Sequence, residues 1–171
     1  MARAGTSTKT VATRFTIAAA QARNIPDIAL LFKAYEAHIG VDLGYQDFAT
    51  EVATLPGKYA PPHGALLIAR DDHGNAIGCV ALRPMEHAGF CCEMKRLFVS
   101  PEGRGVGLGR ALAEAIIEEG AKLSYSELRL DTLPTMQDAI ALYRKLGFVS
   151  IEPYYSAPAG TIFMGRKVDT A

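Results

Sequence analysis

The chain has 171 residues, with 18 Lys and Arg against 18 Asp and Glu, 49% hydrophobic residues and 21% charged residues. This length suits one domain, and this composition is that of a folded globular protein, which excludes a disordered or collagen-like chain. The balanced charge argues against broad binding to nucleic acid, because a surface that follows phosphates carries a basic excess.

The first third of the chain predicts an arm, a strand, two helices and a loop. Residues 1–13 carry basic residues and no acid, and we expect a flexible arm there, with residues 14–171 as a single domain. A short strand is expected over residues 15–20. Apolar residues at helical spacing then predict a helix over 24–39 and a shorter one over 48–55. The segment that follows, as far as Gly64, is rich in Pro and Gly and predicts a loop.

The rest of the chain predicts three successive strands and then alternating helices and strands. The strands are indicated by apolar, β-branched segments between turn residues, and the helices by apolar residues three and four apart. In chain order we expect strands over 65–70, 76–83 and 91–99, a helix over 105–122, a strand over 127–132, a helix over 135–146 and strands over 148–151 and 161–167. Thr135 and Asp138 predict a capping box at the start of the last helix.

The cysteines and the apolar segments indicate the cellular compartment of the protein. Cys79, Cys91 and Cys92 are odd in number and show no CxxC spacing, so neither a disulfide framework nor a zinc site is expected. No apolar run approaches the roughly 18 residues of a membrane span. The N-terminus also lacks the apolar segment of a secretory signal, and a transit peptide is the second interpretation of this basic segment. We therefore expect a cytoplasmic protein with no metal and with neither a membrane nor nucleic acid as partner.

The most informative stretch is residues 97–110, which predict a strand running through a glycine-rich turn into a helix. Glycines let the backbone approach a ligand, and the first N–H groups of a helix have no internal partner, so a pyrophosphate is the natural occupant. The spacing fits neither the dinucleotide pattern GxGxxG nor a Walker A loop. It does fit (Q/R)xxGx(G/A), with Arg104, Gly107 and Gly109.

With this motif the chain resembles the GNAT superfamily of N-acetyltransferases. A second segment, 139–148, resembles the family's second acetyl-CoA motif, and the resemblance covers roughly residues 15–168. It implies an α+β, three-layer fold with a mixed, mostly antiparallel central sheet of six to seven strands and about four helices. The sheet would be splayed between the strand before the glycine loop and the strand after the long helix.

The resemblance implies acetyl-CoA as cosubstrate. The strand before the loop would pair with the pantetheine arm, and the loop amides would hold the pyrophosphate. The residues implied are Leu97, Phe98, Val99, Arg104, Gly105, Val106, Gly107, Leu108, Gly109 and Arg110. For the Arg110 side chain a solvated helix face is an equally good interpretation. Met136 stands where many members have an asparagine that binds pantetheine, so that contact is lost or is made by Thr132, Thr135 or Gln137.

Tyr143 occupies the position of the family's tyrosine that hydrogen-bonds the cofactor sulfur and acts as general acid. The departing thiolate needs a proton, and a phenol with a pKa near 10 is protonated at neutral pH and can supply it. The alternative is that Tyr143 is only a core aromatic.

Glu93 lies where some members carry a general-base glutamate. Because residues alternate along a strand, its side chain is expected on the same face as Lys95 and Leu97. A plain salt bridge is the alternative. His63 and His87 are further candidates by their ordinary pKa, although both lie in turn-like segments.

The resemblance implies direct transfer of acetyl, in a ternary complex, to a primary amine of a small molecule or a peptide, and it allows a homodimer. Candidate wall residues for the acceptor are Tyr59, Arg83, Glu86 and Tyr154, each with a structural alternative. A route through an acetyl-cysteine lacks a nearby histidine to activate the thiol. The competing class is a non-catalytic acyl-CoA-binding or regulatory protein of the same fold, against which Tyr143 argues.

Overall fold

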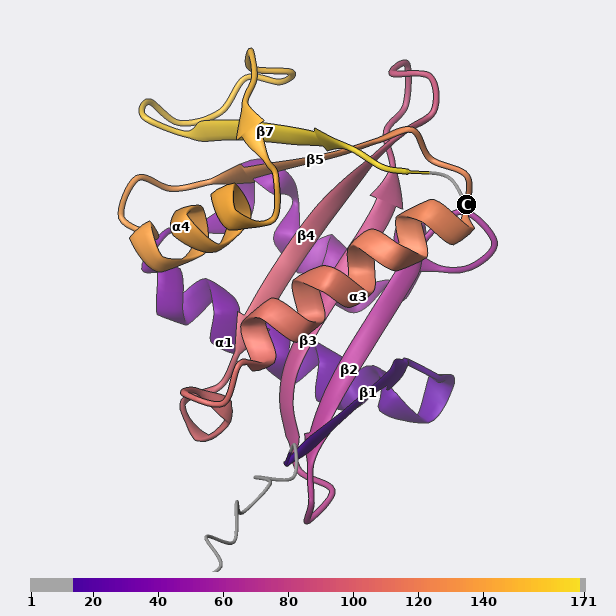
Figure 1. The fold of residues 1–171 in the computed structure, drawn as a ribbon. Coiled ribbons are helices and arrows are strands. Elements are labelled where there is room, and N and C mark those ends of the chain that lie inside the picture. The colour runs from indigo at the N-terminus through magenta and orange to yellow at the C-terminus, as the bar shows by residue number, and fades with distance from the viewer. Residues whose placement is uncertain (1–13, 170–171) are drawn as a thin grey trace, which may run out of the picture.

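The computed structural model describes residues 14–169, which form a seven-stranded sheet with helices on both faces (Figure 1). The predicted arm, residues 1–13, lies outside the described residues. The strand order is β1-β2-β3-β4-β5-β7-β6. In chain order the helices and strands are β1 Phe15–Ala19, α1 Ile25–Ile39, α2 Phe48–Ala53, β2 Ala65–Asp71, β3 Ala76–Pro84, β4 Cys91–Val99, α3 Leu108–Lys122, β5 Glu127–Thr132, α4 Gln137–Lys145, β6 Val149–Ser150 and β7 Ile162–Lys167.

Two helices begin later than the sequence predicts. Helix α3 begins at Leu108, because Gly105 and Gly107 have φ of 81° and 80°, a left-handed backbone that an α-helix cannot contain. Helix α4 begins at Gln137, and its N-cap residue Met136 makes no side-chain cap hydrogen bond. The capping box predicted at this helix is therefore wrong.

The sheet is antiparallel except where β4 meets β5. These two strands pair in parallel only through Cys91–Glu93 with Glu127–Arg129. Beyond Glu93 the two strands diverge, and no further pairing between them occurs in the described residues. The predicted fold class, including the splay between these strands, is confirmed.

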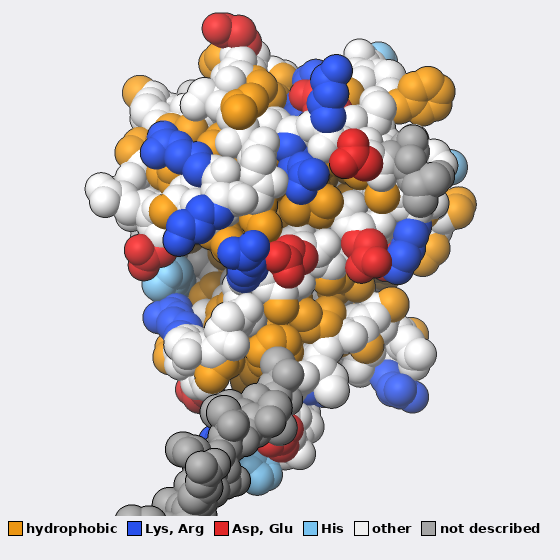
Figure 2. All heavy atoms as spheres, in the orientation of Figure 1, with side chains coloured by type: hydrophobic (Ala, Val, Ile, Leu, Met, Phe, Trp, Pro, Cys, Tyr) orange, Lys and Arg blue, Asp and Glu red, His pale blue; other side chains and the backbone are white. Residues whose placement is uncertain are grey.

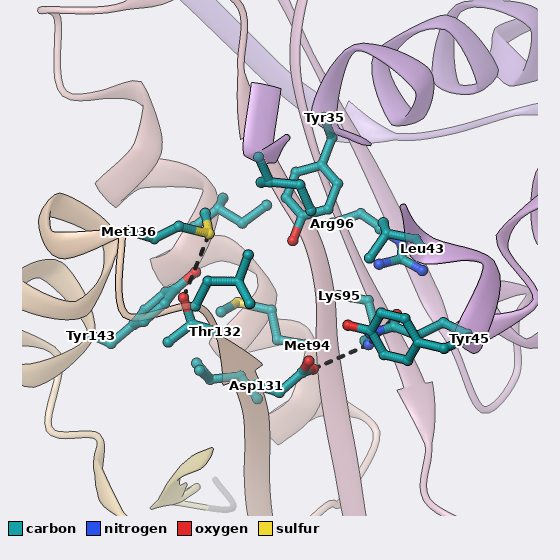
Figure 3. A pocket seen from close by; sticks show the side chains of 15 residues that line it. Tyr35, Leu43, Tyr45, Met94, Lys95, Arg96, Asp131, Thr132, Met136 and Tyr143 are labelled. Atoms are coloured by element: carbon teal, nitrogen blue, oxygen red, sulfur yellow. Dashed lines mark hydrogen bonds and ion pairs between the residues drawn. The ribbon is translucent and has the colours of Figure 1, made fainter. Parts of the chain in front are cut away.

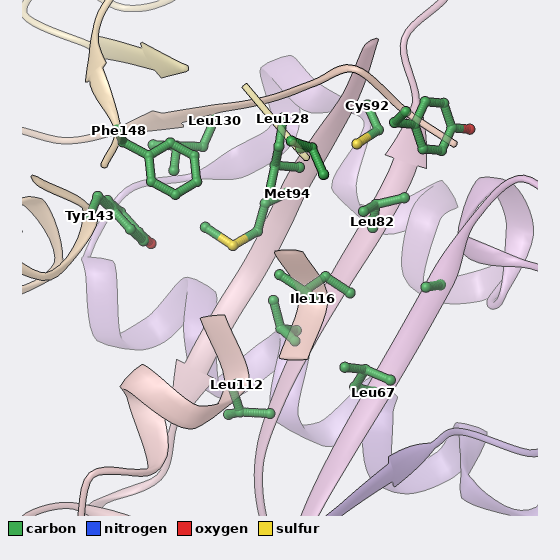
Figure 4. Packing of buried hydrophobic residues seen from close by; sticks show 14 of the residues in the cluster. Leu67, Leu82, Cys92, Met94, Leu112, Ile116, Leu128, Leu130, Tyr143 and Phe148 are labelled. Carbon is green, nitrogen blue, oxygen red and sulfur yellow. The ribbon is translucent and has the colours of Figure 1, made fainter. Parts of the chain in front are cut away.

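Each face of the sheet has its own apolar core. Helix α3 lies in front of the sheet in Figure 1 and buries Leu108, Leu112 and Ile116 at helical spacing (Figure 4). Helix α1 lies behind the sheet and buries Ile28 and Phe32. Each such side chain contributes about 1.5–3 kcal/mol of burial free energy, which fixes both helices on the sheet. Among the described helices, none is long and apolar enough to cross a membrane.

A β-bulge interrupts β4 at the point where it leaves β5. Arg96 and Leu97 both lie opposite Val80 of β3, and Arg96 has φ of 59°. Before the bulge, Glu93 and Lys95 point to the side of α1 and α2, and Arg96 joins them there. Leu97 packs against the core under α3. The expectation that Leu97 shares a face with Glu93 is therefore wrong, because the bulge shifts the alternation by one residue.

Candidate active site in the splay

A narrow pocket occupies the splay between β4 and β5 (Figure 3). Its walls come from α1, the short turn Leu43–Gln46, both strands and α4. It reaches from α4 on one side of the sheet to the turn on the other, and its cavity volume is about 30 Å³, which is the space of about one water molecule. The polar side chains that line it include Tyr35, Tyr45, Gln46, Lys95, Asp131 and Tyr143.

Tyr143 packs in the apolar core and also lines this pocket. Its residue is 5% exposed, and its ring packs edge-on against Phe148 with 5.7 Å between centroids (Figure 4). Its hydroxyl points toward Thr132 and Met136 in Figure 3 and makes no hydrogen bond in the described part of the chain. Burial raises the pKa of this phenol, so it stays protonated at neutral pH. A proton donor thus lines the splay.

The glycine loop presents unused donors. Among residues 14–169, none of the backbone N–H groups of residues 105–110 donates a well-formed hydrogen bond. These amides lead into the N-terminus of α3, where the helix dipole also favours an anion. The loop therefore fits a phosphorylated ligand such as the one the motif predicts.

The two arginines of the loop are engaged within the protein. Arg104 Nε donates to the Val99 carbonyl at 3.2 Å. Arg110 forms an exposed ion pair with Glu114, with Nε 2.8 Å from Oε1, which matches the alternative of a solvated helix face. The free groups of this loop are its amides rather than its side chains.

Of the three residues that could replace the family's asparagine, Thr132 lines the splay pocket, whereas Thr135 and Gln137 do not. Thr132 Oγ1 lies 3.7 Å from the Met136 sulfur and donates to it, and both residues line the pocket. The unpaired edge of β4 beyond Glu93, which includes residues 97–99, remains available to a ligand that lies along it.

Glu93 lies outside the lining of the splay pocket. Its residue is 3% exposed, and Arg83 contacts its Oε1, with Nε at 2.9 Å and Nη2 at 2.8 Å. The Tyr154 hydroxyl donates to its Oε2 at 2.6 Å. Glu93 therefore forms the salt bridge that was the alternative to its role as general base, here with Arg83. That Glu93 is the base stays a prediction. His63 and His87 do not line the pocket either.

Sequence reasoning missed a buried charge cluster at the other mouth of the pocket. Lys95 Nζ lies 3.1 Å from Asp131 Oδ1 and donates to Gln46 Oε1 at 3.0 Å, and the Tyr155 hydroxyl donates to Asp131 at 2.7 Å. Burial alone would raise the pKa of Asp131, but the Lys95 charge and the hydrogen bonds from Tyr155 and Lys95 hold it below its ordinary value. The consecutive bases Lys95 and Arg96 in a central strand were the available signal.

The cysteines and possible metal ligands lie outside this chemistry. Cys91 and Cys92 do not line the pocket, and burial raises the pKa of the Cys92 thiol to about 12. Such a thiol is a poor nucleophile at neutral pH, which agrees with the argument against an acetyl-cysteine. Within the described residues, no three His, Cys, Asp or Glu side chains are grouped so that they could hold a metal ion.

Comparison with known proteins gives the family. Residues 27–148 match the family model described as Acetyltransferase (GNAT) family. The chain is 47% identical over 144 residues to an uncharacterized N-acetyltransferase of Schizosaccharomyces pombe, covering 84% of this chain and 88% of that one.

Two solved structures share the fold. A GNAT-family acetyltransferase of Staphylococcus aureus matches with a TM-score of 0.75 and 17% identity over 91% of this chain and 99% of that chain. A spermidine N-acetyltransferase of Vibrio cholerae, solved with CoA and spermine, matches with a TM-score of 0.69 and 17% identity over 92% and 97% of the two chains. The family match and the Schizosaccharomyces relative show that this chain belongs to the GNAT acetyltransferase family and is an acyl-CoA-dependent N-acetyltransferase.

Proposed function

We propose that the enzyme transfers acetyl from acetyl-CoA directly to a primary amine of a small molecule or peptide within a ternary complex, with Tyr143 as general acid. The observation that supports this proposal is the lining of the splay pocket, which extends from the Tyr143 hydroxyl at one end to the charged and aromatic side chains of Lys95, Asp131 and Tyr45 at the other. Donor and acceptor can then meet from opposite sides. The Vibrio relative, named for spermidine, is an example of a family member that acts on an amine.

The chain's own groups would hold the acetyl donor. When bound, acetyl-CoA supplies an acetyl thioester. The free amides of residues 105–110 would bind its pyrophosphate, and the unpaired edge of β4 over residues 97–99 would bind the pantetheine. The loop amides lack partners within the described chain, and the β4 edge over residues 97–99 is not paired with β5, although the Val99 carbonyl accepts a hydrogen bond from Arg104 Nε.

Proton transfer completes the reaction. As the amine nitrogen bonds to the carbonyl carbon, the C–S bond breaks and the leaving sulfur takes the Tyr143 proton. The amine must also lose a proton. Glu93 remains our candidate base, and because it lies outside the pocket lining, the proton would reach it through water or through Tyr154, whose hydroxyl already donates to it.

We also propose that residues 14–171 act as a single cytoplasmic domain. Two cores on opposite faces of one sheet support the single domain. Three free, buried cysteines support a reducing compartment.

Thermal unfolding with acetyl-CoA, CoA, ATP and NADH side by side tests the donor. A ligand at 100 times its Kd adds about 2.7 kcal/mol, which for a domain of this size raises Tm by about 5–11 °C. We expect this shift with the two CoA ligands only, and its absence with both would refute the proposal. A screen of amines for release of free CoA thiol then separates an enzyme from a binding protein, which would show the shift and release no thiol.

A further inference from the structure

A second and wider pocket adjoins the splay pocket on the side of α1 and α2. It lies between α2, the segment around residues 54–59 and the end of β3, and we call it the outer pocket. Its cavity volume is about 270 Å³, against about 30 Å³ for the splay pocket. A small acceptor can therefore place only its reacting end in the splay and must leave its remainder elsewhere.

The two pockets share a wall. Gln46 lines both of them. Arg96 lines the splay pocket and Glu51 lines the outer pocket, and the two side chains form one ion pair, with Nε 2.9 Å from Oε2 and Nη2 3.0 Å from Oε1. A molecule that passes Gln46 with its amine in the splay would carry its other end into the outer pocket.

The outer pocket holds a buried donor with no acceptor. Tyr59 is 2% exposed, and its hydroxyl makes no hydrogen bond in the described part of the chain. Burial raises the pKa of this phenol, and the Glu51 carboxylate raises it further through its charge and as a nearby acceptor that does not reach good hydrogen-bond geometry, so the phenol stays neutral at neutral pH. Its ring is fixed by an edge-on contact with Phe32, with 6.0 Å between centroids. The hydroxyl is thus a positioned neutral donor, and leaving such a group unpaired is costly.

Arg83 adds a second donor to the same pocket. Its Nε and Nη2 contact Glu93, whereas its Nη1 makes no hydrogen bond among residues 14–169. The carboxylate of Glu51, by contrast, uses both oxygens on Arg96. Lys58 also lines this pocket, and its exposed pair with Glu86 is long, at 3.4 Å. Asp47, the other acidic residue that lines the outer pocket, is exposed to solvent. The Tyr59 hydroxyl and Arg83 Nη1 are thus donors of this pocket that have no well-formed hydrogen bond within the described residues, while the charge of Glu51 is balanced by Arg96.

We propose that the outer pocket binds a carboxylate of the acceptor, so that the substrate class is a primary amine that also carries an acid group, as amino acids do. This inference rests on the proposed function of the splay pocket. The Tyr59 hydroxyl and Arg83 Nη1 bind the carboxylate, and Gln46 turns aside from Lys95 to let the chain between the two groups pass. Hydrogen bonds to charged groups are among the stronger ones, so the acid is a major determinant of specificity.

A matched substrate series tests the class. We would measure kcat/KM, expressed for the unprotonated amine, for ω-amino acids of two to six carbons and for their carboxamides, in which a neutral amide that also donates hydrogen bonds replaces the carboxylate. For at least one chain length we expect the acid to exceed its amide by about tenfold or more, the equivalent of about 1.4 kcal/mol. Equal values, or faster reaction of the amides at every length, would overturn the inference.

Two variants test the residues. Tyr59→Phe removes a hydroxyl that has no partner, so the fold should be kept, while the ratio of acid to amide falls about tenfold. Arg83→Lys keeps a positive charge beside Glu93 and should also lower the ratio. Tyr125→Phe is the control, because it removes a hydroxyl that binds the His63 carbonyl in the neighbouring loop, at 2.6 Å, but does not line the pocket. An unchanged ratio in Tyr59→Phe, or an equal fall in Tyr125→Phe, would refute the assignment.

The outcomes separate this inference from the proposed function. If acetyl is transferred to neutral amines and acids give no advantage, the inference fails and the proposed function stands. If no amine in the series or among the neutral controls releases CoA thiol although acetyl-CoA binds, both fail together.

Discussion

Replacing Glu51 by Gln removes one partner of one of the two most buried ion pairs described above. The Arg96 side chain is 2% exposed and that of Glu51 13%, and two hydrogen bonds of 2.9 and 3.0 Å join them. The guanidinium also lies over the Phe48 ring, 5.1 Å from its centroid, so water cannot readily replace the lost carboxylate. Breaking a buried pair by removing one partner costs about 3–5 kcal/mol. For a chain of this length Tm should fall by about 6–20 °C.

The control has the same chemistry without the burial. Glu114→Gln breaks the Arg110–Glu114 pair, whose atoms are 2.8 Å apart but whose side chains are 56% and 52% exposed. Exposed pairs contribute under about 1 kcal/mol, so this variant should shift Tm by no more than about 4 °C. Thermal unfolding followed by circular dichroism compares the two variants. Equal shifts would show that burial does not set the strength of the Glu51 pair and would refute the reasoning.

Three further predictions follow from the site and its surroundings. Tyr143→Phe keeps the ring packing and should lower kcat by about 10²–10⁴-fold with the acetyl-CoA thermal shift unchanged; a kcat within a few-fold of the parent would remove the acid role. Asp131 has a folded-state pKa below its ordinary value of about 3.9, so its contribution to stability is present above that pH and is lost as pH falls through the folded pKa. The deficit of Asp131→Asn in unfolding free energy should therefore shrink below about pH 4, and a deficit that is constant with pH would contradict this. A methyl group at Gly64 would overlap the Lys58 carbonyl, so Gly64→Ala should cost about 1–3 kcal/mol in denaturant unfolding. Gly120→Ala, whose methyl would meet side chains at 3.5 and 3.6 Å, should be neutral or stabilising, and the reverse order of the two variants would refute the packing argument.

Most of the fold could be predicted because its signals are local. Strands β4 and β5 have the predicted limits, since apolar runs bounded by turn residues are read directly from the chain. The start of α3 was missed because periodicity extends into a segment that positive φ at Gly105 and Gly107 removes from the helix. The bulge at Arg96 was missed because it depends on the register with β3, which the residues of β4 alone do not determine.

The candidate site likewise has one part that the sequence predicts and another that it does not. Tyr143 and the glycine loop are marked by short motifs, and the structure places the tyrosine in the splay pocket and leaves the loop amides without partners. The cluster at the other mouth joins Lys95 to Asp131 and Gln46, which lie 36 and 49 residues away in sequence. No spacing rule connects residues so far apart, and only the meeting of the turn with both strands brings them together.

In the proposed complex, the bulge in β4 lets two parts of one strand, which can change separately, recognise the two substrates. The side chains of Glu93 and Lys95, before the bulge, lie on the side of α1 and α2, where the acceptor is proposed to bind. The edge after the bulge, over residues 97–99, offers main-chain groups, which are the same for every amino acid except proline. Sequence drift before the bulge can therefore alter which amine is accepted, while a donor held by main-chain atoms is retained. In this proposal, β4 can keep its binding site for the acetyl donor while its side chains for the amine acceptor change between relatives.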